Sequence, residues 1–344
     1  MTTLLPQPLH PGDTIGFFSP SAPATVFAPR RFKRAKEFLQ SKGFKMKAGN
    51  LTNCADFYRS GTAQQRAAEL NALIRDPEVR CIMSTIGGDN SNALLPYIDY
   101  DAIKNDPKII IGYSDVTALL MGIYAKTGLI TFHGPALVAS FGESAPLVEE
   151  TFDGFFSLVC TEETSAGIQP HYPYSMPKVW TDIRIEWEEQ TTAKQSYPNS
   201  WQFLGSGKVS GRVIGGNVTT LTGIWGSDYF PDIQTGDILL LEDSLKGIPS
   251  VERCLVHLKL CGVFQRVAAV ILGKYELFDD KGSNRSPLDV LLEILDGYPL
   301  PILNNFDSCH SHPMLTLPIG ATAAIDFDAN TVAIIDSWLT DPSR

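Results

Sequence analysis

The sequence is poor in the features that bind metals or cross membranes. Its six cysteines, among 344 residues, form no C-x-x-C pair and are spread along the chain. This usage favours reduced thiols over a disulfide framework or a zinc site. No run of about 18 apolar residues occurs, so no membrane span is expected. Residues 1–6 lack the charged start and apolar core of a signal peptide, and we therefore expect a cytoplasmic protein.

Basic residues are in the minority. The chain has 28 Lys and Arg against 38 Asp and Glu, for a net charge of −10. This balance gives no electrostatic footprint for nucleic acid or for an anionic membrane. The one basic run, residues 30–36, falls on an expected helix and is interpreted as a solvated face. The hydrophobic fraction of 44% is ordinary for a soluble protein, and the length predicts about two domains.

Strand and helix patterns alternate over residues 10–160. Residues 108–111 are a β-branched run of the kind found in a parallel strand covered on both faces. Directly after it, apolar residues from Val116 to Tyr124 follow helical spacing, and Gly128 ends that helix. Strands are also expected at 15–19 and 81–83, and helices at 29–42 and 63–74. The alternation predicts an α/β fold with a Rossmann-like, doubly wound parallel sheet.

The second half begins with a different composition. Residues 161–205 are rich in Thr, Glu, Ser, Tyr and Pro with little periodicity, although three tryptophans suggest that the segment packs. Strand patterns then return, with a helix at 250–260. We expect an N-terminal domain over residues 1–165, a linker over 166–204 and a smaller C-terminal α/β domain over 205–344.

Ser114 occupies the most informative turn. The chain reads Gly112-Tyr113-Ser114-Asp115 between a buried strand and an amphipathic helix. Such a turn lifts a serine hydroxyl clear of the sheet and sets it at a helix N-terminus, where backbone N–H groups favour a developing oxyanion. The same serine could simply cap the helix. The second glycine of the α/β-hydrolase elbow is absent, so that signature does not apply.

Two glycine-rich turns do not match the motifs of known phosphate-binding loops. Gly87-Gly88 ends another strand, where glycines allow close backbone approach to a ligand, although a plain turn would look the same. It matches neither G-x-G-x-x-G nor a P-loop. The run Gly205-Ser206-Gly207-Lys208 also fails as a P-loop, because Val209 replaces the Ser or Thr that the motif needs.

A serine nucleophile needs a base, and the base needs an orienting carboxylate. His133, after the helix that follows Ser114, is one candidate base, and His310 and His312 are two others. The H-x-H spacing can bind metal, but no acidic or cysteine partner stands at a familiar distance, and no metal is expected. Glu242, with Asp243, ends an apolar strand, which suits an active-site carboxylate and equally a solvated loop.

Taken together, these segments resemble the LD-carboxypeptidase family of serine peptidases. The motifs fall in the family's order from residue 11 almost to the C-terminus, and five motifs in register are highly specific. They are Gly87-Gly88 with residues 94–99, Gly112-Tyr113-Ser114-Asp115, residues 211–217, Glu242-Asp243 and residues 310–320.

The resemblance implies a Ser-Glu-His triad of Ser114, Glu242 and His310. It also implies oxyanion donors at the backbone of Gly87, Gly88 and Asp115, a homodimer, and neither a metal nor a cofactor. One departure is Cys309, where many family members have glycine before the histidine. The pattern H-x-x-P-M still selects His310.

Within the family, the chain resembles the branch that gives immunity to microcin C. The resemblance is carried by residues 91–101 and 122–128, by Ile224-Trp225-Gly226-Ser227 and by the tryptophan-containing linker. It implies cleavage of the amide-type bond between an aspartyl group and a modified adenylate.

An adenine ring would stack on an aromatic side chain, and Trp180 and Trp187 are the candidates. Both could equally be core residues. Glu276 could bind the substrate's α-amino group.

Two alternatives stay open from the sequence. One is an LD-carboxypeptidase that trims the terminal D-alanine of murein tetrapeptide, a substrate without a base to stack. The other is a non-catalytic nucleotide- or peptide-binding module. The presence of all three triad residues argues against a pure binder.

Overall fold

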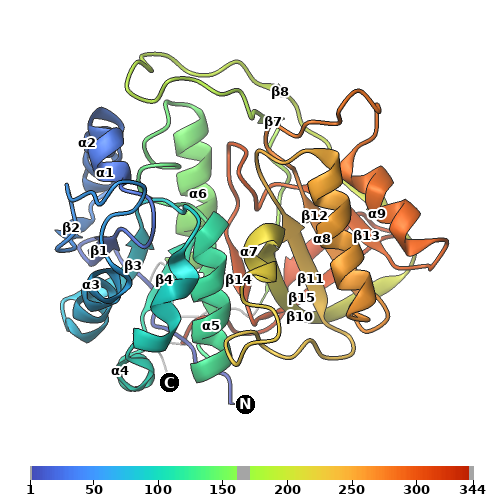
Figure 1. Ribbon diagram of the computed structural model, residues 1–344, viewed down its shortest axis with the longest axis horizontal. Helices are drawn as coiled ribbons and strands as arrows, with labels where there is room; N and C mark the ends of the chain where they lie inside the picture. Colours follow the sequence, from blue (N-terminus) through green and yellow to red (C-terminus); the bar gives the residue numbers. More distant parts are fainter. Residues whose placement is uncertain (1, 161–170, 341–344) are drawn as a thin grey trace.

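The computed structural model describes residues 2–160 and 171–340 and contains two large sheets (Figure 1). The first has six strands in the order β14-β5-β4-β3-β1-β2. Its strands β1 to β5 are parallel, and β14 pairs antiparallel with β5. They are β1 (Thr14–Phe18), β2 (Lys45–Ala48), β3 (Val79–Ser84), β4 (Ile109–Gly112), β5 (Thr131–His133) and β14 (Leu317–Ile319).

The strand order of the first sheet places a crevice at its carboxyl edge. Strand β1 pairs with β2 on one side and with β3 on the other, so the direction of winding reverses between β1 and β3. Ligands of doubly wound sheets bind outside the carboxyl ends of the strands at such a point. The expected doubly wound parallel sheet is confirmed, and Gly87-Gly88 and Ser114 both lie at this edge.

The second sheet has eight strands in the order β6-β16-β15-β10-β11-β12-β13-β9. Strands β10 to β13 are parallel and adjacent, and the strands outside them pair antiparallel. They are β6 (Tyr172–Pro173), β9 (Gln202–Leu204), β10 (Lys208–Asn217), β11 (Ile238–Glu242), β12 (Ala269–Gly273), β13 (Ile302–Phe306), β15 (Thr322–Asp326) and β16 (Thr331–Ile334).

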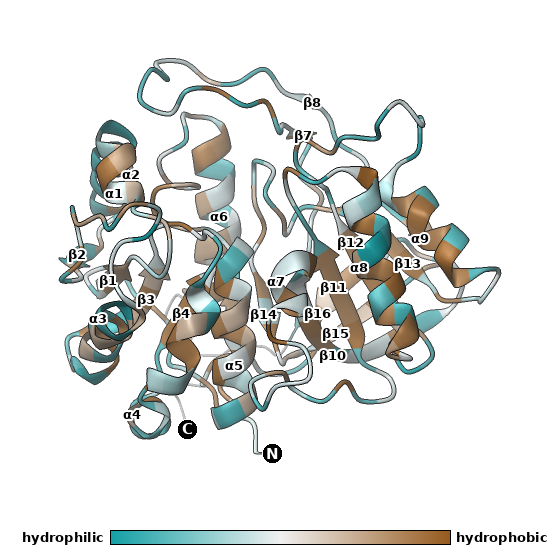
Figure 2. Ribbon diagram, viewed as in Figure 1, coloured by the Kyte–Doolittle hydropathy of each residue, from teal (hydrophilic) through white to brown (hydrophobic). Residues whose placement is uncertain are grey.

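Helices surround both sheets. In Figure 1, α7, α8 and α9 lie together beside the second sheet. In Figure 2 the strands of that sheet are brown, whereas α8 and α9 alternate between brown and teal, as amphipathic helices should. The helices are α1 (Ala24–Phe27), α2 (Pro29–Ser41), α3 (Ala63–Arg75), α4 (Tyr100–Asn105), α5 (Thr117–Thr127), α6 (Leu147–Val159), α7 (Val218–Thr222), α8 (Ile248–Leu260) and α9 (Pro287–Leu295), with 3₁₀ turns η1 (Ser91–Tyr97) and η2 (Ser114–Val116).

Local sequence explains where several helices begin and end. Thr62 and Gln65 form a reciprocal capping box at the start of α3. Helix α5 ends at Gly128, whose φ of 75° suits the left-handed C-cap. Both boundaries agree with those expected from the sequence to within a residue or two.

The segment expected to be a linker does more than join two domains. Its strand β6 forms one edge of the second sheet and its strand β9 forms the other. Between them, β7 (Val179–Trp180) and β8 (Tyr197–Pro198) form a small ladder, and the chain between these two strands arches across the top of Figure 1. The expected domain boundary at residues 165–166 lies outside the described residues.

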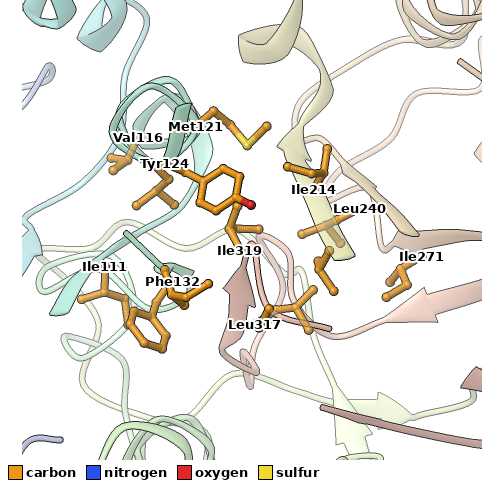
Figure 3. Close-up of a cluster of buried hydrophobic side chains, with 14 of the residues drawn as sticks. Ile111, Val116, Met121, Tyr124, Phe132, Ile214, Leu240, Ile271, Leu317 and Ile319 are labelled. Atoms are coloured by element: carbon orange, nitrogen blue, oxygen red, sulfur yellow. The ribbon is translucent and has the colours of Figure 1, made fainter. Parts of the chain in front are cut away.

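A continuous apolar core joins the two sheets. Figure 3 shows Ile111 and Phe132 of the first sheet beside Leu317 and Ile319 of β14, which in turn face Ile214 and Leu240 of the second sheet. Because β14 follows His310 in sequence yet pairs with β5, the C-terminal part of the chain completes the first sheet. No helix of residues 2–160 and 171–340 is both long and apolar enough to cross a membrane.

A buried ion pair fixes the middle segment against the second sheet. The Lys274 ammonium lies 2.5 Å from the Asp307 carboxylate, and the two side chains are only 5% and 0% exposed. Asp307 also accepts hydrogen bonds from the Trp201 indole at 2.7 Å and the Asn199 amide at 2.9 Å. The carboxylate therefore joins the segment before β9 to the end of β13.

We predict that Lys274→Met lowers the free energy of unfolding by about 3 kcal/mol, because it leaves the Asp307 charge buried without its cation. Urea unfolding measures the change, and Lys274→Met with Asp307→Asn should recover part of it. As a matched control, Lys33 pairs with Glu37 on the surface, where 75% and 61% of the side chains are exposed. Lys33→Met should cost no more than about 0.5 kcal/mol. Equal losses from the two single variants would contradict the prediction.

Candidate active site

The carboxyl ends of strands from both sheets meet at one cleft of about 430 Å³. Ser114 follows β4 of the first sheet, Glu242 ends β11 of the second, and His310 follows β13. Gly87, Gly88, Trp187, Glu276 and both His310 and His312 line the cleft with Ser114. The structure thus brings most of the predicted site residues into one place.

Ser114 sits in a strained turn. Its φ of 61° lies in the left-handed region, which a residue with a side chain adopts at a cost of roughly 1–3 kcal/mol. Two hydrogen bonds from Ser91 to Asp115 stabilise the turn. The Asp115 carboxylate accepts one from the Ser91 backbone N–H at 2.8 Å, and the Asp115 carbonyl accepts one from the Ser91 hydroxyl at 2.5 Å. This strained backbone conformation places Ser114 at the wall of the cleft.

Gly87 and Gly88 leave room that no other residue would leave. A Cβ on Gly87 would lie 2.8 Å from the Cβ of Ser114 and 3.0 Å from the backbone nitrogen of Asp115. Gly88 has a φ of 144°, and a side chain there would collide with the Ser21 hydroxyl. Among the described residues, no hydrogen bond uses the N–H of Gly87 or Gly88. Their amides therefore stand beside the serine as free donors, as an oxyanion site requires.

Glu242 and His310 form a short polar contact at the cleft. The His310 Nδ1 lies 2.5 Å from Oε2 of Glu242, and the glutamate side chain is fully buried. The Tyr113 ring packs edge-on against the imidazole, with centroids 4.8 Å apart. A carboxylate bound to Nδ1 leaves Nε2 as the nitrogen that can take or give a proton in the cleft.

The ionisation of this pair follows from its surroundings. Burial raises the pKa of Glu242, but the charge of His310 and its hydrogen bond, together with the imidazole of His133 nearby, outweigh it and bring that pKa to about 2. Burial lowers the pKa of His310, and the charge of Glu242 with its hydrogen bond outweighs that effect, so the net pKa lies above the ordinary value. The pair therefore favours an ionised glutamate beside a histidine of increased basicity.

His310 and His312 differ in the direction in which their surroundings shift their pKa values. His312 Nε2 lies 3.8 Å from Glu143, a buried carboxylate already paired with Arg31 at 3.0 Å and Lys194 at 3.2 Å. Burial and the charge of Lys194 lower the pKa of His312 well below its ordinary value. A base must hold a proton during the reaction, so of the two histidines only His310 suits the task.

The structure separates the two candidate tryptophans and corrects the interpretation of the basic run. Trp187 lines the cleft, whereas Trp180 lies outside it, packs against Tyr197 and has the Lys274 ammonium 5.4 Å from its ring. Arg31 belongs to the basic run interpreted as a solvated face, yet its side chain is fully buried. Its guanidinium lies 4.5 Å from the Trp187 ring and binds Glu143. Arg31 therefore supports the face of Trp187 that it covers.

Sequence reasoning missed Lys194 and Lys246, which also line the cleft. Lys194 lies in the irregular segment between β7 and β8, where no periodicity signals burial, and Lys246 lies in a loop. Among the described residues, no group of three or more His, Cys, Asp or Glu side chains is arranged to hold a metal. The sequence offers no local signal for the burial of Lys194.

Comparison with known proteins places the chain in a family. Residues 15–134 match the LD-carboxypeptidase N-terminal domain, and residues 210–325 match the LD-carboxypeptidase C-terminal domain. The chain belongs to the LD-carboxypeptidase family. The first matched region spans the parallel strands of the first sheet, and the second spans the parallel strands of the second sheet together with β14 of the first.

Several members of the LD-carboxypeptidase family are similar over nearly the whole chain. A Vibrio cholerae protein that carries a provisional carboxypeptidase name is 62% identical over 98% of this chain and 99% of its own. The Microcin C7 self-immunity protein MccF of Escherichia coli is 58% identical over 98% of this chain and 97% of its own. A solved apo structure of MccF superposes with a TM-score of 0.95 over 98% of this chain and 100% of that one, at 57% identity. MccF structures include a complex with aspartyl sulfamoyl adenosine.

We predict that His310 titrates above pH 6.5 and that Glu242→Gln moves its pKa downward, because burial is then opposed by much less negative charge. Titration of the imidazole signals by NMR measures both values. His312 serves as the internal comparison, since its pKa is lowered mainly by burial and by Lys194 and should move much less than that of His310. An unchanged His310 titration in Glu242→Gln would contradict this account.

Proposed function

We propose that this protein is a serine hydrolase that detoxifies microcin-C-like compounds. It would cleave the amide-type bond between an aspartyl group and a modified adenylate, with Ser114, His310 and Glu242 as its triad. The observation that carries the proposal is the junction of the strained serine with the buried Glu242–His310 pair in one cleft. The similarity to MccF, of which structures with aminoacyl sulfamoyl nucleotides exist, supports the substrate class.

In the proposed reaction, the Ser114 hydroxyl attacks the acyl carbon while His310 Nε2 takes its proton. The carbonyl oxygen becomes an oxyanion, for which the amides of Gly87, Gly88 and Asp115 are the proposed donors. The carbon–nitrogen bond then breaks, the leaving nitrogen takes the proton from His310, and an acyl-enzyme remains. Water, deprotonated by the same histidine, releases the aspartate and restores Ser114.

Glu242 would act through His310 alone. It fixes the tautomer with its proton on Nδ1 and stabilises the imidazolium that forms when Ser114 gives up its proton. Its full burial strengthens this interaction, because the dielectric around the pair is low.

The two ends of the substrate would be recognised by Trp187 and Glu276. The Trp187 ring contacts the Arg31 guanidinium at 4.5 Å and the Phe27 ring at 6.2 Å, and the part of it that lines the cleft is the proposed platform for a nucleobase. Glu276 lines the cleft and is partly buried, and desolvation raises its pKa, so a cationic partner such as the substrate's α-amino group would stabilise its charged form. The cytoplasmic location and the homodimer expected from the sequence belong to this proposal.

The first test is turnover of aspartyl sulfamoyl adenosine by the purified protein, followed by mass spectrometry. We expect free aspartate and sulfamoyl adenosine, and no product from Ser114→Ala. Murein tetrapeptide is assayed in parallel. Release of D-alanine alone would leave the triad in place and replace the substrate. Absence of turnover together with absence of fluorophosphonate labelling at Ser114 would favour a binding module and overturn the proposal.

We predict that Trp187→Ala raises KM for the nucleotide substrate by roughly 10- to 100-fold, since base stacking on an aromatic contributes about 1–3 kcal/mol. Trp180→Ala is the matched control, because its ring lies outside the cleft, and its KM should stay near the wild-type value. Michaelis–Menten kinetics with both variants measure the difference. A larger increase of KM in Trp180→Ala than in Trp187→Ala would contradict the assignment of the stacking role to Trp187.

A further inference from the structure

His133 is a buried histidine that the proposed reaction does not use. It ends β5, is fully buried, and its Nε2 points at Oε1 of Glu242 from 3.7 Å. This is the glutamate oxygen that His310 does not contact. Neither of the two atoms has a hydrogen-bond partner among the described residues. Two buried polar atoms thus face each other across a gap that is longer than a hydrogen bond but too short for a water molecule.

The Ser308 hydroxyl suits either tautomer, because it can donate to Nδ1 or accept from it while donating to the His133 carbonyl at 3.4 Å, so Glu242 decides between them. His133 Nδ1 lies 3.0 Å from the hydroxyl of Ser308, which follows β13. If Nδ1 carried the proton, the Nε2 lone pair would face a buried carboxylate, and the two would repel. With the Ser308 hydroxyl as donor to Nδ1, the Nε2–H points at Glu242. The favourable arrangement therefore has an N–H dipole directed at the free carboxylate oxygen.

We propose that His133 is a positioning residue, and that its Nε2–H orients and stabilises the second oxygen of Glu242 so that the first remains bound to His310. This inference rests on the proposed triad. It gives Glu242 a partner on each oxygen, one from β5 of the first sheet and one from the loop after β13 of the second. A buried carboxylate with one satisfied oxygen would otherwise be free to rotate or to take a proton.

The proposal predicts the direction of a pH effect. An N–H directed at Glu242 stabilises the state in which the Glu242–His310 pair carries a net negative charge. Removing it makes the pair hold its next proton more tightly, so the acidic limb of any His310-dependent rate moves to higher pH. The other charged or titratable groups that face this pair are Tyr113, Asp243, Tyr275, Glu276 and His312, and they are the same in every variant.

The test compares three substitutions at one position. The amide nitrogen of His133→Gln can take the place of Nε2, whereas that of His133→Asn can take only the place of Nδ1 and cannot reach Glu242. His133→Phe keeps the ring and has no donor. The measurement is the rate at which a fluorophosphonate labels Ser114 as a function of pH. We expect the acidic limb to shift upward by about one pH unit in the Asn and Phe variants, and to stay in place in the Gln variant.

The outcomes separate this inference from the proposed function. If the wild type labels at Ser114 but the Asn and Gln variants share the wild-type limb, the positioning role is overturned and the triad stands. If the wild type fails to label, the triad and the positioning role fall together. A uniform loss of rate in all variants without a shift would show a structural role only and would also overturn the inference. Should Phe unfold the protein, the Asn–Gln pair decides the matter, with thermal unfolding as its control.

Discussion

The pairing of β14 with β5 is the contact on which the geometry of the site depends. Leu317 lies opposite His133 in this antiparallel ladder. The segment that follows His310 is therefore hydrogen-bonded to the sheet that carries Ser114. Neither sheet alone contains a complete site, because Glu242 belongs to the second sheet and Ser114 to the first. The ladder, buried within the core of Figure 3, converts two sheets into one frame. A rotation of one sheet against the other would move Glu242 away from Ser114.

The residues around Ser114 show how this frame holds a strained turn. A left-handed serine is unfavourable by itself, and the free energy must come from contacts that form only in the folded chain. Ser91 supplies two hydrogen bonds to Asp115, and Gly87 permits a close approach that any Cβ would prevent. The strain and the free amides of the glycines are therefore two results of the same close packing. Rigid donors of this kind are the ones that stabilise a developing charge without first having to reorient.

The sequence was informative wherever a function needs a local pattern. A β-branched run before Ser114 and a helical pattern after it were enough to place the turn, and Gly128 was enough to end α5. The return of β14 to the first sheet could not be predicted, because its partner strand lies far away in sequence. The roles of β6 and β9 as sheet edges were hidden for the same reason, since two or three residues carry no periodicity. The sequence could not show which of Trp187 and Trp180 lines the cleft, because their surroundings come from residues distant in sequence. The Trp187 ring packs on the buried Arg31, and the Trp180 ring packs against Lys274 and Tyr197.

Two buried carboxylates near the cleft have opposite surroundings, and the difference assigns the histidines their tasks. Glu143 is paired with two permanent cations, Arg31 and Lys194. Burial and the charge of Lys194 lower the pKa of His312, so its neutral form is favoured. Glu242 has no such cation within contact among the described residues, only the imidazoles of His310 and His133. Its charge can therefore be balanced by a proton that comes and goes on His310. A lysine in that place would hold its proton too strongly to exchange it, so in the proposed mechanism the lack of a permanent cation beside Glu242, among the described residues, lets a proton move on and off His310.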